Sequence, residues 1–130
     1  MTLLDTNTIV HYIKGNPGVV QRMQASSPGE LAVPSIVVYE LERGTLQTKS
    51  TKRRSLIAAV LQPLQVISFD GDAALEAAHI HTELKSKGVL IGPIDLLIAG
   101  TARSRGAMLV TNNTSEFRHV KGLRIDDWRT

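Results

Sequence analysis

The sequence predicts an α/β domain with a mostly parallel sheet of four or five strands. Short apolar runs alternate with stretches of helical periodicity, which is the pattern of strands joined by helices. Turns that contain glycine or proline separate several of these stretches. The 130 residues, 42% of them hydrophobic, are enough for one hydrophobic core, so we expect a single domain spanning residues 1–130.

The expected strands are the short apolar runs. The first is residues 2–5, whose two leucines precede Asp5. A fifth strand at the sheet edge depends on residues 123–125, where the apolar run is short. The remaining strands are expected at residues 30–34, 66–69 and 107–110.

Helical spacing and capping residues place the helices between these strands. Ser35 is a natural N-cap, and Gly44 suits the end of the helix that follows it. Asp72 is expected to cap the longest helix, and Pro93 stands in the first turn of another. The helices are expected at residues 8–14, 18–25, 36–43, 55–61, 72–87 and 93–105.

Composition excludes several kinds of site. The absence of cysteine rules out disulfides, thiolate zinc sites, iron–sulfur centres and a cysteine nucleophile, so any metal must be held by carboxylates, histidine or asparagine. Five aromatic residues are too few for a base-stacking sheet, so nucleic-acid binding would depend on phosphate contacts and on the net charge of +3. No apolar run approaches a membrane span and no secretory signal is seen, so we expect a cytoplasmic protein without membrane contact.

Three acidic residues occupy unusual positions relative to the expected strands. Asp5 ends the first strand, Glu40 shares the apolar face of its helix with Leu41, and Asp95 lies in the first turn of the helix that starts at Pro93. Each has an ordinary alternative: helix capping for Asp5 and Asp95, and pairing with Arg43 for Glu40. The carboxyl ends of parallel strands meet at one edge of a sheet, however, and this favours a common site for the three acids.

A polar loop follows the fourth strand and is expected at the same edge. Asn112 and Asn113 could be turn formers, and Glu116 could be a solvated acid. Taken together with the three other acids, Glu116 would complete a site made of oxygen ligands. Such a site prefers Mg²⁺, with Mn²⁺ as the alternative, and the predicted set is Asp5, Glu40, Asp95 and Glu116.

Five separated blocks of the sequence resemble the PIN-domain ribonucleases, and most closely the VapC toxins of type II toxin–antitoxin modules. The resemblance runs in the same order along nearly the whole chain. The blocks are residues 3–7 (LLDTN), 35–44 (SIVVYELERG), 92–99 (GPIDLLIA), 110–117 (VTNNTSEF) and 127–128 (DW).

The resemblance implies a three-layer α/β/α fold and assigns roles to the acids. Asp5, Glu40 and Asp95 match the three acids of the family motif, with Asp5 and Asp95 as principal metal ligands and Glu40 sharing the metal and orienting the attacking water. Many members have an aspartate soon after the fourth strand, and this chain departs from them by offering Asn112, Asn113 and Glu116 there. The catalytic set is then Asp5, Glu40, Asp95 and Glu116, and the substrate-binding set is Thr6, Asn7, Asn112, Asn113, Lys49 and Arg53.

The resemblance also implies an activity and partners. It implies an endoribonuclease toxin dependent on Mg²⁺ that cleaves structured RNA, such as the anticodon stem-loop of initiator tRNA, and inhibits translation and growth. A VapB-type antitoxin would neutralise it, a homodimer is expected, and operator DNA would be bound only through the antitoxin.

Two other functions fit parts of the sequence. A phosphatase with an aspartyl nucleophile would place its nucleophile at Asp5, but that chemistry usually has a second aspartate where this chain has Asn7. A catalytically silent scaffold within a DNA-binding repressor complex is the non-enzymatic alternative, although a silent scaffold has no need of Glu40 on an apolar stripe. Nucleotide-binding glycine motifs are absent.

Overall fold

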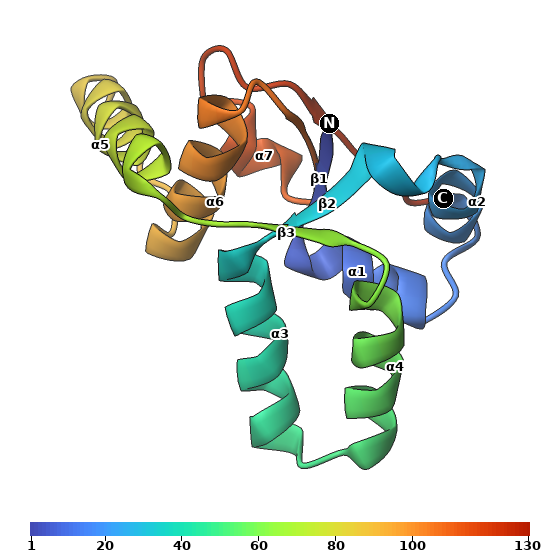
Figure 1. Cartoon of the computed structure of the whole chain (residues 1–130). Helices are drawn as coiled ribbons and strands as arrows, with labels where there is room; N and C mark the ends of the chain where they lie inside the picture. Colours follow the sequence, from blue (N-terminus) through green and yellow to red (C-terminus); the bar gives the residue numbers. More distant parts are fainter.

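A five-stranded sheet forms the centre of the molecule, in the order β3-β2-β1-β4-β5, and every neighbouring pair is parallel (Figure 1). The structure is a computed structural model that describes residues 1–130. The parallel sheet confirms the α/β fold class. The strands are β1 (Thr2–Leu4), β2 (Leu31–Pro34), β3 (Gln65–Ile67), β4 (Met108–Val110) and β5 (Ile125–Asp126).

Helices cover both faces of the sheet, so the molecule has three layers. One layer contains α1, α3 and α4, and the opposite layer contains α5, α6 and α7 (Figure 1). The change of side follows from the strand order, because right-handed crossovers that run outward from β1 and then back past it place their helices on opposite faces. The helices are α1 (Thr6–Ile13), α2 (Pro17–Ala25), α3 (Ser35–Thr48), α4 (Thr51–Leu61), α5 (Gly71–Ser86), α6 (Pro93–Ser104) and α7 (Thr114–Phe117), with a 3₁₀ turn at Pro28–Glu30.

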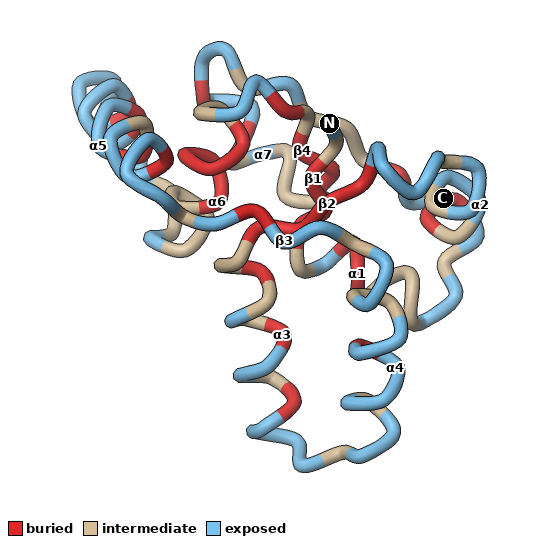
Figure 2. Tube along the Cα trace, viewed as in Figure 1, coloured by how far each residue is buried: buried red, intermediate tan, exposed pale blue.

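The core follows the central strands. Leu3 and Leu4 of β1 and Leu109 and Val110 of β4 are fully buried, because helices pack on both faces of a parallel sheet. Figure 2 shows this buried track along the strands, while the helices are exposed on their outer sides. None of the helices has the length and apolar content needed to cross a bilayer.

Several of the expected helix boundaries are wrong. Helix α4 begins at Thr51, four residues before the expected start at residue 55, because the Ser50 hydroxyl caps it by accepting a hydrogen bond from the Arg53 amide at 3.1 Å. Helix α3 continues through Gly44 to Thr48 and ends at Lys49, whose φ of 55° is left-handed. It continues because Leu41 and Thr45 are buried on its inner face, and this packing outweighs the weak helix propensity of one glycine. Helix α5 is capped by Asp70 rather than Asp72, since the Asp70 carboxylate accepts a hydrogen bond from the Ala73 amide at 2.9 Å.

Helix α6, which carries Asp95, is held in place by α5. A Cβ atom at Gly100 would lie 2.7 Å from the Ala77 Cβ and 2.8 Å from the Ala73 carbonyl oxygen, so the two helices approach as closely as glycine allows. Near the far end of α6, Arg103 donates hydrogen bonds to Glu76 and Glu83 of α5. These contacts fix α6 relative to the sheet and therefore fix the position of Asp95.

Candidate active site

Asp5 is buried at the end of β1, with only 3% of its surface exposed. Its carboxylate accepts hydrogen bonds of 2.7 Å from the Thr6 amide and from the Thr111 hydroxyl, and the first of these caps α1. Burial raises the pKa of Asp5 and the nearby charge of Glu40 adds to the rise, whereas the two hydrogen bonds oppose it. Asp5 therefore caps α1 and at the same time belongs to the acidic cluster.

Glu40 lies on α3 and faces the start of α1. The Thr6 hydroxyl donates a hydrogen bond of 2.6 Å to its carboxylate. Arg43, one turn further along α3, is 3.9 Å away, at the limit of an ion pair. The charge of Glu40 acts on Asp5, so the two carboxylates lie near each other. The side chain of Glu40 is 19% exposed and therefore remains partly open to solvent.

Asp95 and Glu116 are joined by Asn113. The Asn113 side-chain amide donates to the Asp95 carboxylate at 3.0 Å and also to the Glu116 carboxylate. Burial raises the pKa of Asp95 to about 7, helped by hydrogen bonding with Glu116 and by the charges of Asp5 and Glu116. Hydrogen bonding with Asp95 and with Asn113 lowers the pKa of Glu116.

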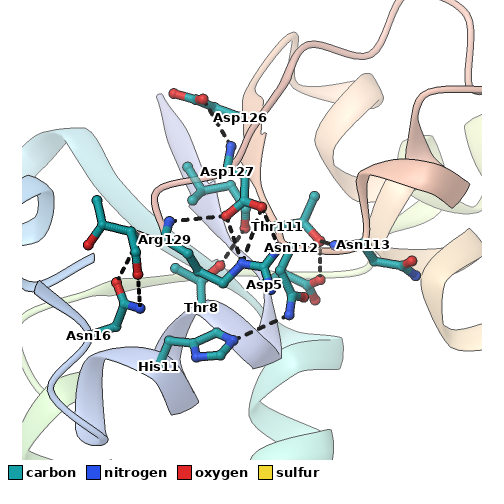
Figure 3. A network of polar contacts seen from close by, with 12 residues as sticks. Asp5, Thr8, His11, Asn16, Thr111, Asn112, Asn113, Asp126, Asp127 and Arg129 are labelled. Carbon is teal, nitrogen blue, oxygen red and sulfur yellow. Dashed lines mark hydrogen bonds and ion pairs between the residues drawn. The ribbon is translucent and has the colours of Figure 1, made fainter. Parts of the chain in front are cut away.

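Thr111 links the two halves of the cluster and was not identified from the sequence as a site residue. It is fully buried directly after β4. Its hydroxyl donates a hydrogen bond to the Asp5 carboxylate and accepts one of 3.0 Å from the backbone N–H of Asn113. Figure 3 shows it between these two residues. Its place directly after a buried strand, at the edge that carries Asp5, is the signal that could have identified it.

The other expected substrate contacts lie in different places. Asn112 turns toward α1, where its amide nitrogen is 3.3 Å from Nε2 of His11 (Figure 3), and Asn7 is exposed on the first turn of α1. Lys49 is exposed at the turn between α3 and α4, and Arg53 packs beside Gly44. Lys49 comes nine positions after Glu40, about 13 Å along the helix axis, so the structure does not bring Lys49 to the acids.

The donor set fits a hydrated divalent cation. Its side chains offer carboxylate, amide and hydroxyl oxygens, which suit Mg²⁺ or Mn²⁺. No three acidic or histidine side chains converge into a complete cage, and Mg²⁺ is usually held by one or two carboxylates while it keeps several waters. Burial and neighbouring carboxylates disfavour the ionised forms of Asp5 and Asp95 and so raise the pKa of both, and a cation between them would favour the ionised forms.

Comparisons with known proteins agree with this arrangement. Residues 2–123 match the PIN domain family. A tRNA(fMet)-specific endonuclease VapC of Shigella flexneri is 37% identical over 127 residues, which cover 97% of this chain and 96% of the relative. Ribonuclease VapC2 of Rickettsia felis is 33% identical over 129 residues, with the same coverage.

Solved structures give the same result. The chain superimposes with a TM-score of 0.89 and 32% identity on a structure of VapBC2 from Rickettsia felis bound to a promoter DNA fragment, with 98% of each chain covered. DNA-bound VapBC from Salmonella typhimurium gives a TM-score of 0.85 at 37% identity, covering 98% of this chain and 97% of that one. The chain therefore belongs to the PIN-domain family and, within it, to the VapC ribonucleases.

Proposed function

We propose that this protein is the endoribonuclease toxin of a type II toxin–antitoxin module, that it depends on Mg²⁺, and that it acts in the cytoplasm. The observation that carries the proposal is the acidic cluster at the carboxyl edge of the sheet, in which burial and neighbouring carboxylates raise the pKa of Asp95 to about 7. A relative in Shigella flexneri and another in Salmonella typhimurium are named as tRNA(fMet)-specific endonucleases. We therefore propose the anticodon stem-loop of initiator tRNA as the substrate, with loss of translation and growth as the consequence.

In this proposal Asp5 and Asp95 hold the cation, and Glu40 shares it and orients the attacking water. Bound Mg²⁺, or Mn²⁺ in its place, would supply positive charge to the phosphate oxygens and favour ionisation of water. The Thr6 hydroxyl, which donates to Glu40, fixes the carboxylate that faces the water. Asn113 positions Asp95 and Glu116 together, and Glu116 completes the acidic set.

We assign the substrate-binding residues to two groups, one close to the acids and one further away. Thr6, Asn7 and Asn113 belong to the immediate surroundings of the scissile phosphate in this proposal, and Asn112 supports them from the adjoining turn. Lys49 and Arg53 belong to the α3–α4 hairpin, so we assign them to phosphates further along the RNA. Charge removal at Lys49 should weaken binding to all RNA sequences and reduce its salt dependence.

Cleavage assays test the acid assignments. Purified protein with Mg²⁺ should cut an initiator tRNA transcript and leave 5′-phosphate and 3′-hydroxyl ends. The substitutions Asp5→Asn, Glu40→Gln and Asp95→Asn should each abolish the cut, and so should excess chelator. Wild-type rates in Asp95→Asn would remove Asp95 from the mechanism, and cleavage that survives chelation would remove the metal.

The substrate is tested in cells. After brief induction, mapping of newly formed 5′ ends should give one dominant site in the anticodon loop of initiator tRNA. Cuts scattered over messenger RNA would contradict the tRNA assignment while leaving the ribonuclease assignment intact.

We also propose a VapB-type antitoxin as partner, a homodimer of the toxin, and contact with operator DNA only through the antitoxin. The support is that structural relatives are VapBC complexes, two of them bound to DNA. Co-expression with the product of the adjacent small gene should abolish toxicity, and the toxin alone should not shift operator DNA in a gel. Equal toxicity with and without that product would contradict the proposed neutralisation.

A further inference from the structure

We propose that Arg53 is a phosphate clamp that sets which phosphodiester bond of the RNA is cut. Its guanidinium binds the phosphate next to the scissile one, while the acids act on the scissile phosphate itself. This inference rests on the proposed RNA cleavage. It gives one residue of the α3–α4 hairpin a defined contact and a defined consequence, which is the position of the cut.

Arg53 differs from the other arginines because its side chain is partly buried and has no partner within the chain. Its Nε atom is buried without a hydrogen-bond acceptor, and no carboxylate lies within ion-pair distance of the guanidinium. A partly buried cation without a partner is disfavoured, so this position favours an anion from outside the chain. Apart from Arg118, which is exposed, every other arginine forms an ion pair or donates to a backbone carbonyl: Arg22, Arg43, Arg54, Arg103, Arg105, Arg124 and Arg129.

The guanidinium of Arg53 lies on the flank of α3 that carries Glu40. A Cβ atom at Gly44 would lie 3.4 Å from Nη2 of Arg53, so the end of this side chain rests against the backbone of Gly44. Gly44 follows Glu40 by four residues, which places both on one flank of the helix, about 6 Å apart along its axis. The guanidinium is therefore about one helical turn from an acid of the cluster.

Gly44 provides the room for this guanidinium. Glycine in the interior of a helix costs stability, and local propensity gives no reason for it inside α3. An added Cβ would already be in van der Waals contact with Arg53, so a longer side chain at this position would displace the guanidinium. Glycine at position 44 thus keeps the cation close to the acids.

The position and chemistry of Arg53 fit a phosphate of the substrate strand. A guanidinium presents its N–H donors in a planar fork that matches the oxygens of a phosphate. One nucleotide can span one turn of helix, so a strand whose scissile phosphate faces the acids places the next phosphate against Arg53. Because Arg53 is held between two helices, this contact fixes the register of the strand.

Binding to a labelled RNA stem-loop tests the clamp. Anisotropy is measured for Arg53→Gln, Arg53→Lys and Lys52→Gln, all in an Asp95→Asn background so that the RNA stays intact. Arg53→Gln should weaken binding about 10- to 100-fold and reduce the slope of log Kd against log salt by about 0.7–1. Arg53→Lys keeps the charge without the fork and should give an intermediate loss.

Lys52→Gln is the matched control, because it removes the same charge from an exposed neighbouring position of α4. It should weaken binding less than about threefold. Equal losses in Lys52→Gln and Arg53→Gln would show only a general attraction and would overturn the clamp. A lower Tm of Arg53→Gln with unchanged RNA binding would show that Arg53 only packs the hairpin.

A second set of RNAs locates the phosphate. Each stem-loop carries one uncharged methylphosphonate linkage at a position next to the cut. At one position this change should weaken binding by the protein with Arg53 and leave Arg53→Gln unaffected, since the contact is already lost. Equal losses in both proteins at every position would refute the contact.

The position of the cut is a readout that a purely structural role would not move. With Asp95 restored and Mg²⁺ present, wild type and Lys52→Gln should cut the stem-loop at one bond. Arg53→Gln should cut neighbouring bonds as well, because the strand can shift by one nucleotide. A slower cut at the same single bond would overturn the role of Arg53 in register.

Failure of the proposed function would look different. If the wild-type protein binds the stem-loop but does not cut it with Mg²⁺, the endonuclease proposal fails, whereas the methylphosphonate series still decides the phosphate contact. Unchanged RNA binding by Arg53→Gln together with lost neutralisation by the antitoxin would assign Arg53 to the protein partner and refute the clamp.

Discussion

Thr111 determines how the acidic cluster is organised at the scale of single residues. Its hydroxyl donates a hydrogen bond to the Asp5 carboxylate and accepts one from the backbone N–H of Asn113. The side-chain amide of Asn113 in turn donates to Asp95 and Glu116. Because Thr111 and Asp5 are both buried, water cannot replace the bond when the hydroxyl is removed. A hydrogen bond to a charged group is worth about 1.5–3 kcal/mol, so the position of Asp5 depends strongly on this contact.

Thr111→Val should lower kcat for RNA cleavage about 10- to 100-fold, because Asp5 loses its side-chain donor. The loss should be greater at low pH, since the missing hydrogen bond lets the pKa of Asp5 rise further. Thr111→Ser keeps the hydroxyl and is the control, expected near wild type. A pH–rate profile of all three proteins checks this, and a profile for Thr111→Val that is lower but parallel to wild type would contradict a role through the Asp5 carboxylate.

Close packing of α5 on α6 is the decisive feature at the scale of elements. Glycine in the middle of a helix usually weakens it, but Gly100 permits backbone contact with Ala73 and Ala77. Gly44, inside α3, has a different environment: the nearest atom to an added Cβ is the flexible end of Arg53, at 3.4 Å. Two glycines with the same local propensity therefore have opposite roles.

Gly100→Ala should destabilise the protein by about 1–3 kcal/mol or more, because the new methyl group overlaps the backbone of α5. Gly44→Ala is the matched control and should be neutral or stabilise by up to about 1 kcal/mol, since alanine favours helix. Urea unfolding followed by circular dichroism measures both. Equal free energies of unfolding for Gly100→Ala and wild type would show that α5 can move away without cost.

At the scale of the whole molecule, the chain has a net charge of +3 but contains a cluster of acids in which only Glu40 has a nearby cation, Arg43. Asp5 and Asp95 have raised pKa values, whereas Asp70 and Asp127, which lie outside the cluster, have lowered ones because they accept hydrogen bonds and face arginine. The two kinds of group affect stability in opposite directions and in different pH ranges. The acidic cluster therefore makes the metal-free fold less stable near neutral pH.

Without metal, stability should fall as the pH rises from about 4 to about 7. In that range the unfolded chain has released the Asp95 proton while the folded protein retains it, so the slope of unfolding free energy against pH is negative. After allowance for partial exposure, the fall should amount to about 1–2 kcal/mol. Asp95→Asn should flatten this slope in urea titrations with EDTA. An equally steep slope in that variant would assign the effect to other groups.

The lowered pKa values of Asp70 and Asp127 predict how stability changes at acidic pH. Asp70 and Asp127 contribute stability that is present above their unfolded pKa values and is lost as the pH falls through the lower folded values. Stability should therefore also decline below about pH 4.

Mg²⁺ should stabilise the folded protein at neutral pH. Since the cation binds the folded cluster and not the unfolded chain, a concentration 100-fold above its Kd adds about 2.7 kcal/mol. The increase in Tm should disappear in Asp95→Asn and persist in Lys52→Gln, which lies outside the cluster. A Tm increase retained in Asp95→Asn would place the cation elsewhere.

Local patterns were sufficient for the order of elements and for the acids. Asp5, Glu40, Asp95 and Glu116 could be predicted as a group because parallel strands bring their carboxyl ends to one edge, so residues far apart in the sequence share a predictable location. The boundary at Gly44 could not be predicted, because burial of Leu41 and Thr45 outweighs local propensity. The cap at Asp70 rather than Asp72 depends on where β3 ends, which local signals fix only to within a few residues.

The sequence by itself determined the α/β class, and it predicted a site of oxygen ligands together with the acids that would compose it, because these follow from periodicity, residue type and strand order. Only the tertiary structure decided that Thr111 links Asp5 to Asn113, that Thr6 bonds to Glu40, and that Lys49 lies far from the acids. Hydrogen-bond partners and exposure depend on side-chain directions across several elements, and the separation of residues along the chain does not specify them.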